Sequence, residues 1–130
     1  MTQEDKQLLI KDLCARLPYG VKCLADGKYL GVLSGASIGD IYKVFFFKGI
    51  DPSFNIEEIK PFLRPMLSMT EAETEKYHSF CEFDDGDYTG YPMWFNTIES
   101  FEYLYSIHID VWNFIGKGLA LEAPEGMYNK

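Results

Sequence analysis

The chain is predicted to fold as an α+β domain, because the local pattern changes twice along its 130 residues. Residues 1–20 have helical spacing, residues 21–60 have short alternating runs broken by glycines, and the second half is again mostly helical. A chain of this length buries roughly two thirds of its unfolded surface, which is enough for one core. We expect a single domain, residues 1–130, with an N-terminal helix, a small curved antiparallel sheet and a helical C-terminal half packed on it.

The first helix is predicted from its cap and from its apolar spacing. Thr2 and Asp5 form an approximate capping box, and apolar residues then recur at helical intervals from Leu9 to Leu17. Pro18-Tyr19-Gly20 is typical of a helix end.

The sheet is predicted over residues 21–60. Val21–Ala25 alternates, Asp26-Gly27 indicates a hairpin turn, and Lys28–Ser34 continues as the second strand. Gly35–Gly39 is expected to be a loop and Ile41–Phe47 a third strand. The short strands and the glycine bends favour an SH3-like partial barrel.

The connection to the second half contains three prolines. Asp51-Pro52 is expected to open a connector, and Asn55–Phe62 fits either a fourth strand or a short helical turn. Pro61 and Pro65 exclude a long helix here, because proline lacks the N–H that a helix interior needs.

Two more helices are predicted in the second half. Thr70 caps one that runs to about Cys81, and a third starts at Thr97 or Ser100. The segment between them, residues 84–92, is expected to be a loop because it is rich in Asp, Gly and Pro. Residues 111–117 suggest a short helical turn, and residues 119–123 suggest a closing strand.

Charge is divided unevenly along the chain. Residues 1–64 hold 9 Lys and Arg against 8 Asp and Glu, whereas residues 65–130 hold 3 against 12. The acidic half is also aromatic, since 12 of the 21 Phe, Tyr and Trp residues lie between Tyr77 and Phe114. A net charge of −8 opposes binding to phosphate backbones, so we expect no direct nucleic-acid binding, although Lys22, Lys28, Lys43 and Lys48 fall in the strand region.

The N-terminus and the cysteines predict a cytoplasmic protein. The first five residues lack the basic start of a signal peptide, and the longest aliphatic and aromatic run, Val44–Phe47, is too short to cross a membrane. Cys14, Cys23 and Cys81 are odd in number and form no CxxC pair, which favours free thiols. No Gly-rich phosphate loop or zinc spacing is present, and we expect no cofactor and no metal.

Two long stretches resemble a family of short proteins from gut Bacteroidetes and from their phages and mobile elements. They are Ile59-Lys-Pro-Phe-Leu-Arg-Pro-Met66 with Ser68-Met-Thr70, and Gly116-Lys-Gly-Leu-Ala-Leu-Glu-Ala-Pro-Glu-Gly-Met-Tyr128. The opening segment, residues 12–23, is similar too. The family is functionally uncharacterised, so the resemblance implies a bacterial or phage accessory protein and no catalytic residues.

The leading functional hypothesis is a non-catalytic protein-binding module. Its candidate binding residues are the acids and tyrosines around the predicted loop: Glu82, Asp84, Asp85, Asp87, Tyr88 and Tyr91. Aromatic side chains concentrate binding energy at interfaces, and the carboxylates favour a basic protein partner. Trp94 and Phe95 are expected to be buried, whereas Tyr88 and Tyr91 fit either environment. The loop acids can also supply oxygen ligands to Ca²⁺, but Asp-Asp-Gly-Asp lacks the alternating register of a calcium loop.

The alternative hypothesis is a small enzyme. His108 with Asp110 resembles acid–base machinery, and Cys81 is a candidate nucleophile with His78 or His108. Residues two apart on a helix point in different directions, so His108 and Asp110 can meet only if the helix ends between them. His108 also continues the apolar stripe of the third helix, and acids surround Cys81, so a structural histidine and an unreactive thiol are favoured.

Overall fold

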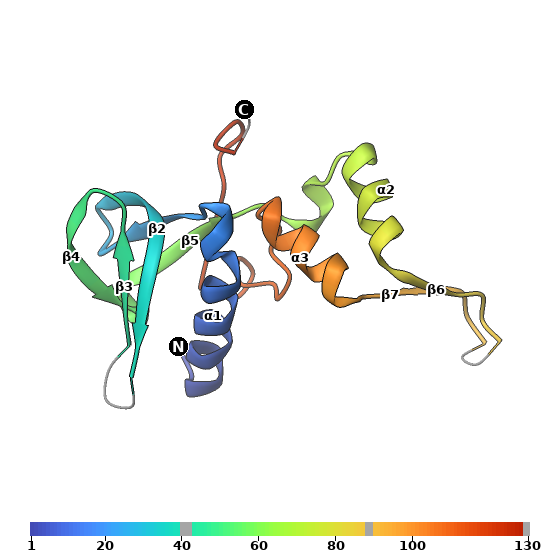
Figure 1. Cartoon of the computed structure of the whole chain (residues 1–130), viewed down its shortest axis with the longest axis horizontal. Helices are drawn as coiled ribbons and strands as arrows, with labels where there is room; N and C mark the ends of the chain where they lie inside the picture. Colours follow the sequence, from blue (N-terminus) through green and yellow to red (C-terminus); the bar gives the residue numbers. More distant parts are fainter. Residues whose placement is uncertain (40–42, 88–89, 129–130) are drawn as a thin grey trace.

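The computed structural model describes residues 1–39, 43–87 and 90–128 and confirms the α+β class (Figure 1). Its main feature is a six-stranded sheet in the order β4-β3-β2-β1-β5-β8. The strands are β1 (Lys22–Ala25), β2 (Tyr29–Ile38), β3 (Lys43–Phe47), β4 (Ile50–Asn55), β5 (Ile59–Leu63) and β8 (Leu121–Glu122). Neighbouring strands are antiparallel except β5 and β8, which pair in parallel.

Three α-helices flank this sheet or lie beyond it, and a threonine caps the N-terminus of each. They are α1 (Gln3–Arg16), α2 (Glu71–Phe80) and α3 (Ile98–Ser106). Thr2, Thr70 and Thr97 each accept a hydrogen bond from the backbone N–H three residues later, which confirms the predicted helix starts. Among the described residues, no helix has the length and apolar character needed to span a bilayer.

Two predictions about the sheet are wrong. β2 continues through Gly35 to Ile38, where a loop was expected, and a β-bulge between Leu33 and Gly35 accommodates it. The expected connector at Asp51-Pro52 is part of β4. Proline is tolerated there because β4 is an edge strand, whose outer side needs no N–H donor. The predicted start of the third strand at Ile41 lies outside the described residues.

The segment from Asn55 to Phe62 contains both of the alternatives predicted for it. Ile56–Glu58 forms a 3₁₀ turn, and β5 follows at once and pairs with β1. The sheet remains open: β4 and β8 are its two edges. No closed barrel forms, and the SH3-like assignment stays a prediction.

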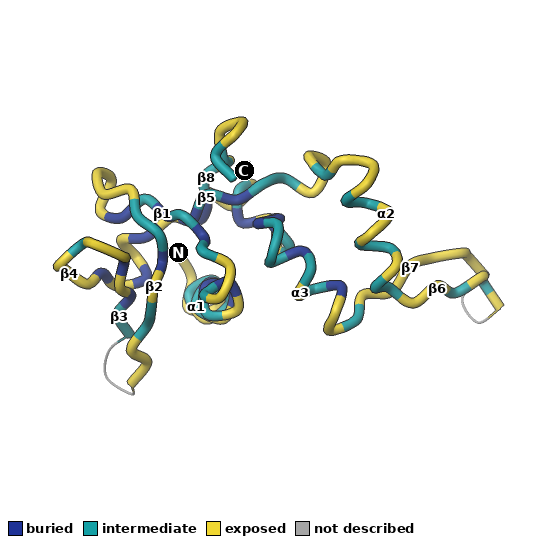
Figure 2. The backbone as a smooth tube through the Cα atoms, turned by 45° about the horizontal axis from the view of Figure 1, so that its top comes forward, coloured by how far each residue is buried: buried dark blue, intermediate teal, exposed yellow. Residues whose placement is uncertain are grey.

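The core lies between α1 and the sheet. α1 contributes Leu9 and Leu13, and the central strands contribute alternating buried side chains such as Cys23, Leu33 and Phe45. The C-terminal segment completes this core with the buried residues Phe114, Leu119 and Ala120. Dark segments in Figure 2 gather in this part of the molecule.

A buried ion pair fastens α1 to the segment after α3. The Arg16 guanidinium donates to both carboxylate oxygens of Asp12, at 2.7 and 3.1 Å, and also to the carbonyl oxygen of Ile109 at 2.6 Å. Both side chains of the pair are fully buried, and the Tyr105 ring lies 4.8 Å from the guanidinium. Burial raises the pKa of the Asp12 carboxyl, while Arg16 opposes that shift.

The molecule has two parts of different character. We call residues 1–64 with 107–130 the sheet lobe, and residues 65–106 the hairpin lobe. The sheet lobe contains 11 Lys and Arg and 11 Asp and Glu, whereas the hairpin lobe contains one Lys against nine Asp and Glu, a net charge of −8. Within its described residues, the hairpin lobe buries only Ser100 and Leu104. The whole net charge of the chain therefore lies on its least buried part.

Candidate binding surface

A two-stranded ribbon projects from the hairpin lobe at one end of the molecule (Figure 1). It consists of β6 (Glu82–Asp84) and β7 (Met93–Phe95), in antiparallel register with Phe83 opposite Trp94. The sequence prediction of a loop for residues 84–92 is correct between the strands but missed both of them. Strands of three residues are too short to show an alternating pattern.

The aromatic side chains of this ribbon are exposed, which corrects the expectation that Trp94 and Phe95 are buried. Their exposed fractions are 46% for Trp94 and 41% for Phe95, and Phe83 reaches 55%. Trp94 stacks flat on the His78 ring of α2, with centroids 4.3 Å apart, and Phe83 lies 4.8 Å from Trp94. Phe83 and Trp94 thus pack on one another and on His78 of α2, and the rings of Phe83, Trp94 and Phe95 all remain partly exposed.

The four predicted acidic residues lie together on the ribbon and its loop. Glu82, Asp84, Asp85 and Asp87 line a hollow of about 440 Å³ with Phe83 and Phe95. Two of the carboxylates also hold the turn, because Asp84 accepts a hydrogen bond from the N–H of Gly86 at 2.8 Å and Asp85 accepts one from the N–H of Asp87 at 3.1 Å. Across the described ranges, no group of three His, Cys, Asp or Glu is placed to hold a metal ion.

Of the two predicted tyrosines, the structure describes Tyr91. Tyr91 is 74% exposed, beside the turn closed by the hydrogen bond from Gly90 N–H to Gly86 O at 2.8 Å. Tyr88 lies outside the described residues. The chemistry available at this surface is apolar and aromatic contact next to negative charge, which suits a cationic or amphipathic partner surface.

His108 lies past the end of α3 and not on it. Its φ of 66° is in the left-handed region, and α3 ends at Ser106. The imidazole is buried and stacks on Tyr128 with centroids 3.7 Å apart. Burial, followed by the charges of Arg16, Arg64 and Lys22, lowers the pKa of His108 to about 4. The ring is therefore neutral at pH 7 and packs as an apolar side chain.

Asp110 holds the backbone of the following turn. One carboxylate oxygen accepts a hydrogen bond from the N–H of Phe114 and the other from the N–H of Ile115, each at 2.9 Å. Both carboxylate oxygens are therefore engaged by backbone donors of the turn that follows. α3 ends before both residues, at Ser106, and the side chains of His108 and Asp110 take separate structural partners.

Cys81 follows directly after α2 and is half-buried. Its backbone N–H donates to the carbonyl of His78, the candidate base three residues earlier, whose ring stacks on Trp94. Burial, followed by the neighbouring Cys81, raises the pKa of the Tyr77 hydroxyl. The thiol therefore lies beside the Tyr77 hydroxyl.

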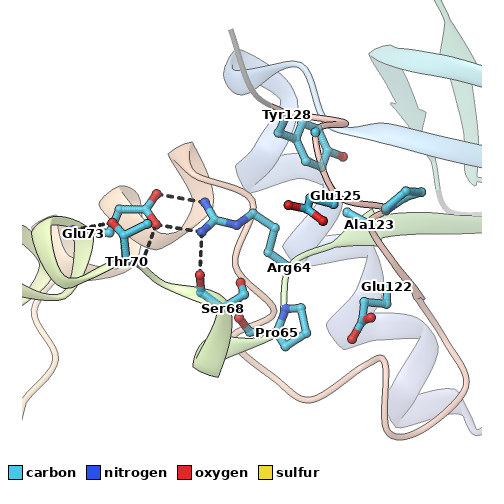
Figure 3. A pocket seen from close by; sticks show the side chains of 11 residues that line it. Arg64, Pro65, Ser68, Thr70, Glu73, Glu122, Ala123, Glu125 and Tyr128 are labelled. Carbon is cyan, nitrogen blue, oxygen red and sulfur yellow. Dashed lines mark hydrogen bonds and ion pairs between the residues drawn. The ribbon is translucent and has the colours of Figure 1, made fainter.

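A second hollow, of about 500 Å³, was missed by the sequence reasoning and lies where the two lobes join (Figure 3). Its central feature is Arg64, which donates to both carboxylate oxygens of Glu73, at 2.7 and 2.9 Å. Arg64 also donates to the carbonyl oxygens of Ser68 and Ile107. Its hydrogen bonds with Arg64 lower the pKa of Glu73 to about 2. Arg64, the last residue before the hairpin lobe, therefore binds both α2, through Glu73, and the residue that follows α3, Ile107.

Apart from Glu73, the residues that line this hollow belong to the two stretches quoted above for their resemblance. One wall holds Arg64, Pro65 and Ser68, and the other is residues 122–126 with Tyr128. The parallel pairing of β5 with β8 brings the two stretches side by side. The two motifs themselves are the sequence signal that could have indicated this site. β8 is only two residues long, however, so nothing in the sequence indicated that it pairs with β5.

Comparisons of the chain with protein-family models, with curated proteins and with solved structures found no match.

Proposed function

We propose that this chain is a non-catalytic protein-binding module and that the β6–β7 ribbon is its docking surface. The observation that carries the proposal is the exposure of Phe83, Trp94 and Phe95 on a projecting ribbon, away from the core of the sheet lobe. Large aromatic side chains in such positions are typical of interface hot spots. Phe83 and Trp94 pack together on one face of the ribbon and Phe95 lies on the other, so both faces present exposed aromatic surface.

The partner surface is basic. The charged residues of the ribbon and its described loop are all acidic, and the hairpin lobe carries a net charge of −8. Charge of one sign on one end of a molecule accelerates encounter with the opposite charge and orients it before contact. The proposal includes mimicry of nucleic acid as one form, in which the carboxylates occupy the basic site of a nuclease or repressor.

The cellular setting is proposed on separate grounds. Cys14, Cys23 and Cys81 are free thiols, which supports residence in a reducing cytoplasm. The family resemblance supports a bacterial or phage accessory element. The chemistry of the ribbon describes the partner surface as basic and partly apolar.

The test is site-specific photocrosslinking with matched positions. A benzophenone amino acid replaces Phe95 in one variant and Tyr29 on the sheet lobe in another, since the two side chains are exposed to similar extents, 41% and 38%. Crosslinked proteins are captured from nuclease-treated host lysate and identified by mass spectrometry. Each candidate is then purified and its affinity measured directly.

The proposal requires three results together. A basic protein crosslinks from position 95 and not from position 29, and the purified pair binds. Its affinity also falls as salt rises from about 0.1 to about 1 M, because the screening length shortens from about 10 to about 3 Å. Equal crosslinking from both positions, or affinity unchanged by salt, contradicts the proposal.

A further inference from the structure

The β6–β7 ribbon is an incomplete sheet. Two strands of three residues are marginally stable in water, and a third strand or a covering layer is what normally stabilises such a ribbon. In the described part of the chain, no strand pairs with the outer edge of either β6 or β7. Antiparallel strands leave alternate N–H and C=O groups pointing outward at each such edge, ready to pair with another chain.

The two edges differ in the side chains beside them. Glu82 and Asp84 of β6 lie on one face of the ribbon, because side chains alternate along a strand, and Phe83 lies on the other. The cross-strand neighbours of the two acids are Phe95 and Met93. A strand added beside β6 therefore meets two carboxylates on one face and a phenyl ring on the other, whereas one added beside β7 meets no charge.

We propose that a partner segment in extended conformation adds to the outer edge of β6 as a third strand, with a basic–apolar–basic sequence opposite Glu82, Phe83 and Asp84. This inference rests on the proposed function and specifies how the ribbon engages its partner. Backbone hydrogen bonds supply affinity in this mode of recognition, and the alternating side chains supply specificity.

The same charges exclude the most abundant competing strand, a second copy of this chain. Pairing β6 with β6 places carboxylates opposite carboxylates, and like charges directly opposite are destabilising in a sheet. Charged residues at an edge strand are a common device against self-association. β4, one of the two edge strands of the main sheet, is protected differently. It carries Pro52, which has no N–H to offer to another strand. The acids of β6 thus reject a second copy and select a basic strand.

The experiment uses a designed peptide as the probe, because the natural partner is unidentified. The peptide is Gly-Lys-Val-Arg-Val-Lys-Gly, capped at both ends and titrated into ¹⁵N-labelled full-length protein. Two further peptides carry backbone N-methyl groups, one at both valines and the other at the basic residues. Only one of these two sets of amides faces β6 in a paired strand. A fourth peptide replaces the basic residues with Glu.

Strand addition predicts an asymmetric result. One methylated peptide binds about thirtyfold more weakly than the parent, because about two backbone hydrogen bonds are lost, while the other binds as the parent does. Shift changes centre on the amides of residues 82–84, those amides exchange more slowly with solvent, and the Glu peptide does not bind.

Protein variants give the second arm. Glu82→Gln with Asp84→Asn is expected to weaken parent-peptide binding about tenfold, through two lost cross-strand charge pairs. Asp51→Asn with Glu125→Gln removes the same charge from exposed positions on the sheet lobe and is expected to leave binding within about twofold, since distant exposed charges are screened.

Four results overturn strand addition: both methylated peptides bind as the parent does, the shift changes centre on β7, no peptide binds, or β6 amides shift with protein concentration alone. None of these results contradicts the proposed function if position 95 still crosslinks a basic protein. That protein then docks on the ribbon without adding a strand to β6. Conversely, the peptides can give the asymmetric result while position 95 crosslinks no partner. In that case β6 still pairs with a basic strand, but the evidence for a docking function is lost.

Discussion

The sheet lobe and the hairpin lobe are built from similar residues but use them in opposite ways. Phe45 and Phe47 of β3 are buried in the core to which α1 also contributes, whereas Phe83 and Phe95 of the ribbon are 55% and 41% exposed. The sheet lobe balances its charges and buries an ion pair, while the hairpin lobe carries a net charge of −8 around its exposed rings. The difference lies in layering: α1 and the C-terminal segment pack on the main sheet, whereas the ribbon meets α2 through the stack of Trp94 on His78 and stays largely exposed.

This contrast separates stability from recognition within one chain. A ring under a second layer stabilises the fold through the area it removes from water. A ring without one contributes little until a partner covers it, and then its burial stabilises the complex. The two lobes should therefore respond differently to the same substitution.

The largest difference is expected from truncating one phenylalanine in each lobe. Phe45→Ala leaves a cavity in the core and should lower the free energy of unfolding by about 3–5 kcal/mol. Phe95→Ala removes a side chain that is 41% exposed and should cost less than about 1 kcal/mol. Urea denaturation followed by circular dichroism measures both. Equal losses would mean that the ribbon belongs to the cooperative core.

The second-largest effect is expected at the buried ion pair of Asp12 and Arg16 in the sheet lobe. Asp12→Asn leaves the Arg16 charge buried without its partner and should cost about 3 kcal/mol. The double variant Asp12→Leu/Arg16→Met removes both charges and should be more stable than Asp12→Asn, because no buried charge is left unpaired. Should the double variant be the less stable of the two, the hydrogen bond from Arg16 to Ile109 would be the dominant contact.

The helices and most of the strands of the main sheet could be predicted because their signals are local. A threonine with a suitable residue three positions later specifies each helix start, and Asp26-Gly27 specifies the first hairpin. β4 could not be predicted from Asp51-Pro52, because the tolerance of proline there depends on β4 being at the edge. That position is a property of the whole sheet, which no local window contains.

The candidate surface was predicted in part. The acids at residues 82–87 were identified from their clustering, but the exposure of Trp94 and Phe95 was not. Burial of an aromatic residue depends on what packs over it, and α2 covers the ribbon only through the stack of His78 on Trp94. The joint at Arg64 was also missed, because its partners Glu73 and Ile107 are 9 and 43 residues away in sequence.

A pH-dependent effect of intermediate size is expected in the sheet lobe. His108 has a pKa of about 4 in the folded protein, against about 6.5 when unfolded. As pH falls from about 6.5 to about 4, the unfolded chain binds a proton that the folded chain does not. Stability should therefore be full above pH 6.5 and fall by about 2 kcal/mol across this window, as measured by urea denaturation at several pH values.

The control for this effect is His108→Asn. Asparagine tolerates the left-handed backbone of this position and does not titrate. The variant loses the stack on Tyr128 and should be less stable at pH 7, but its stability should depend less on pH between 6.5 and 4. An unchanged slope would assign the acid sensitivity to other groups.

The smallest effect is expected at Arg64 and Glu73, where the two lobes meet. Both side chains are partly exposed, so water screens the pair, and Glu73→Gln should cost only about 1 kcal/mol. Glutamine still accepts the hydrogen bond that Thr70 N–H gives to Glu73, so the cap of α2 survives.

Glu73→Ala also removes the acceptor for the Thr70 N–H, one of the two hydrogen bonds of the capping box, and should cost about 1 kcal/mol more than Glu73→Gln. Because Glu73 lies on α2 and its partner Arg64 lies in the sheet lobe, the loss of the pair should loosen the hairpin lobe selectively. Hydrogen exchange should therefore accelerate in α2 and α3 of Glu73→Gln while the amides of β1 and β2 keep their rates. Uniform acceleration in both lobes would mean that the lobes unfold as one unit, and that their difference lies in surface chemistry alone.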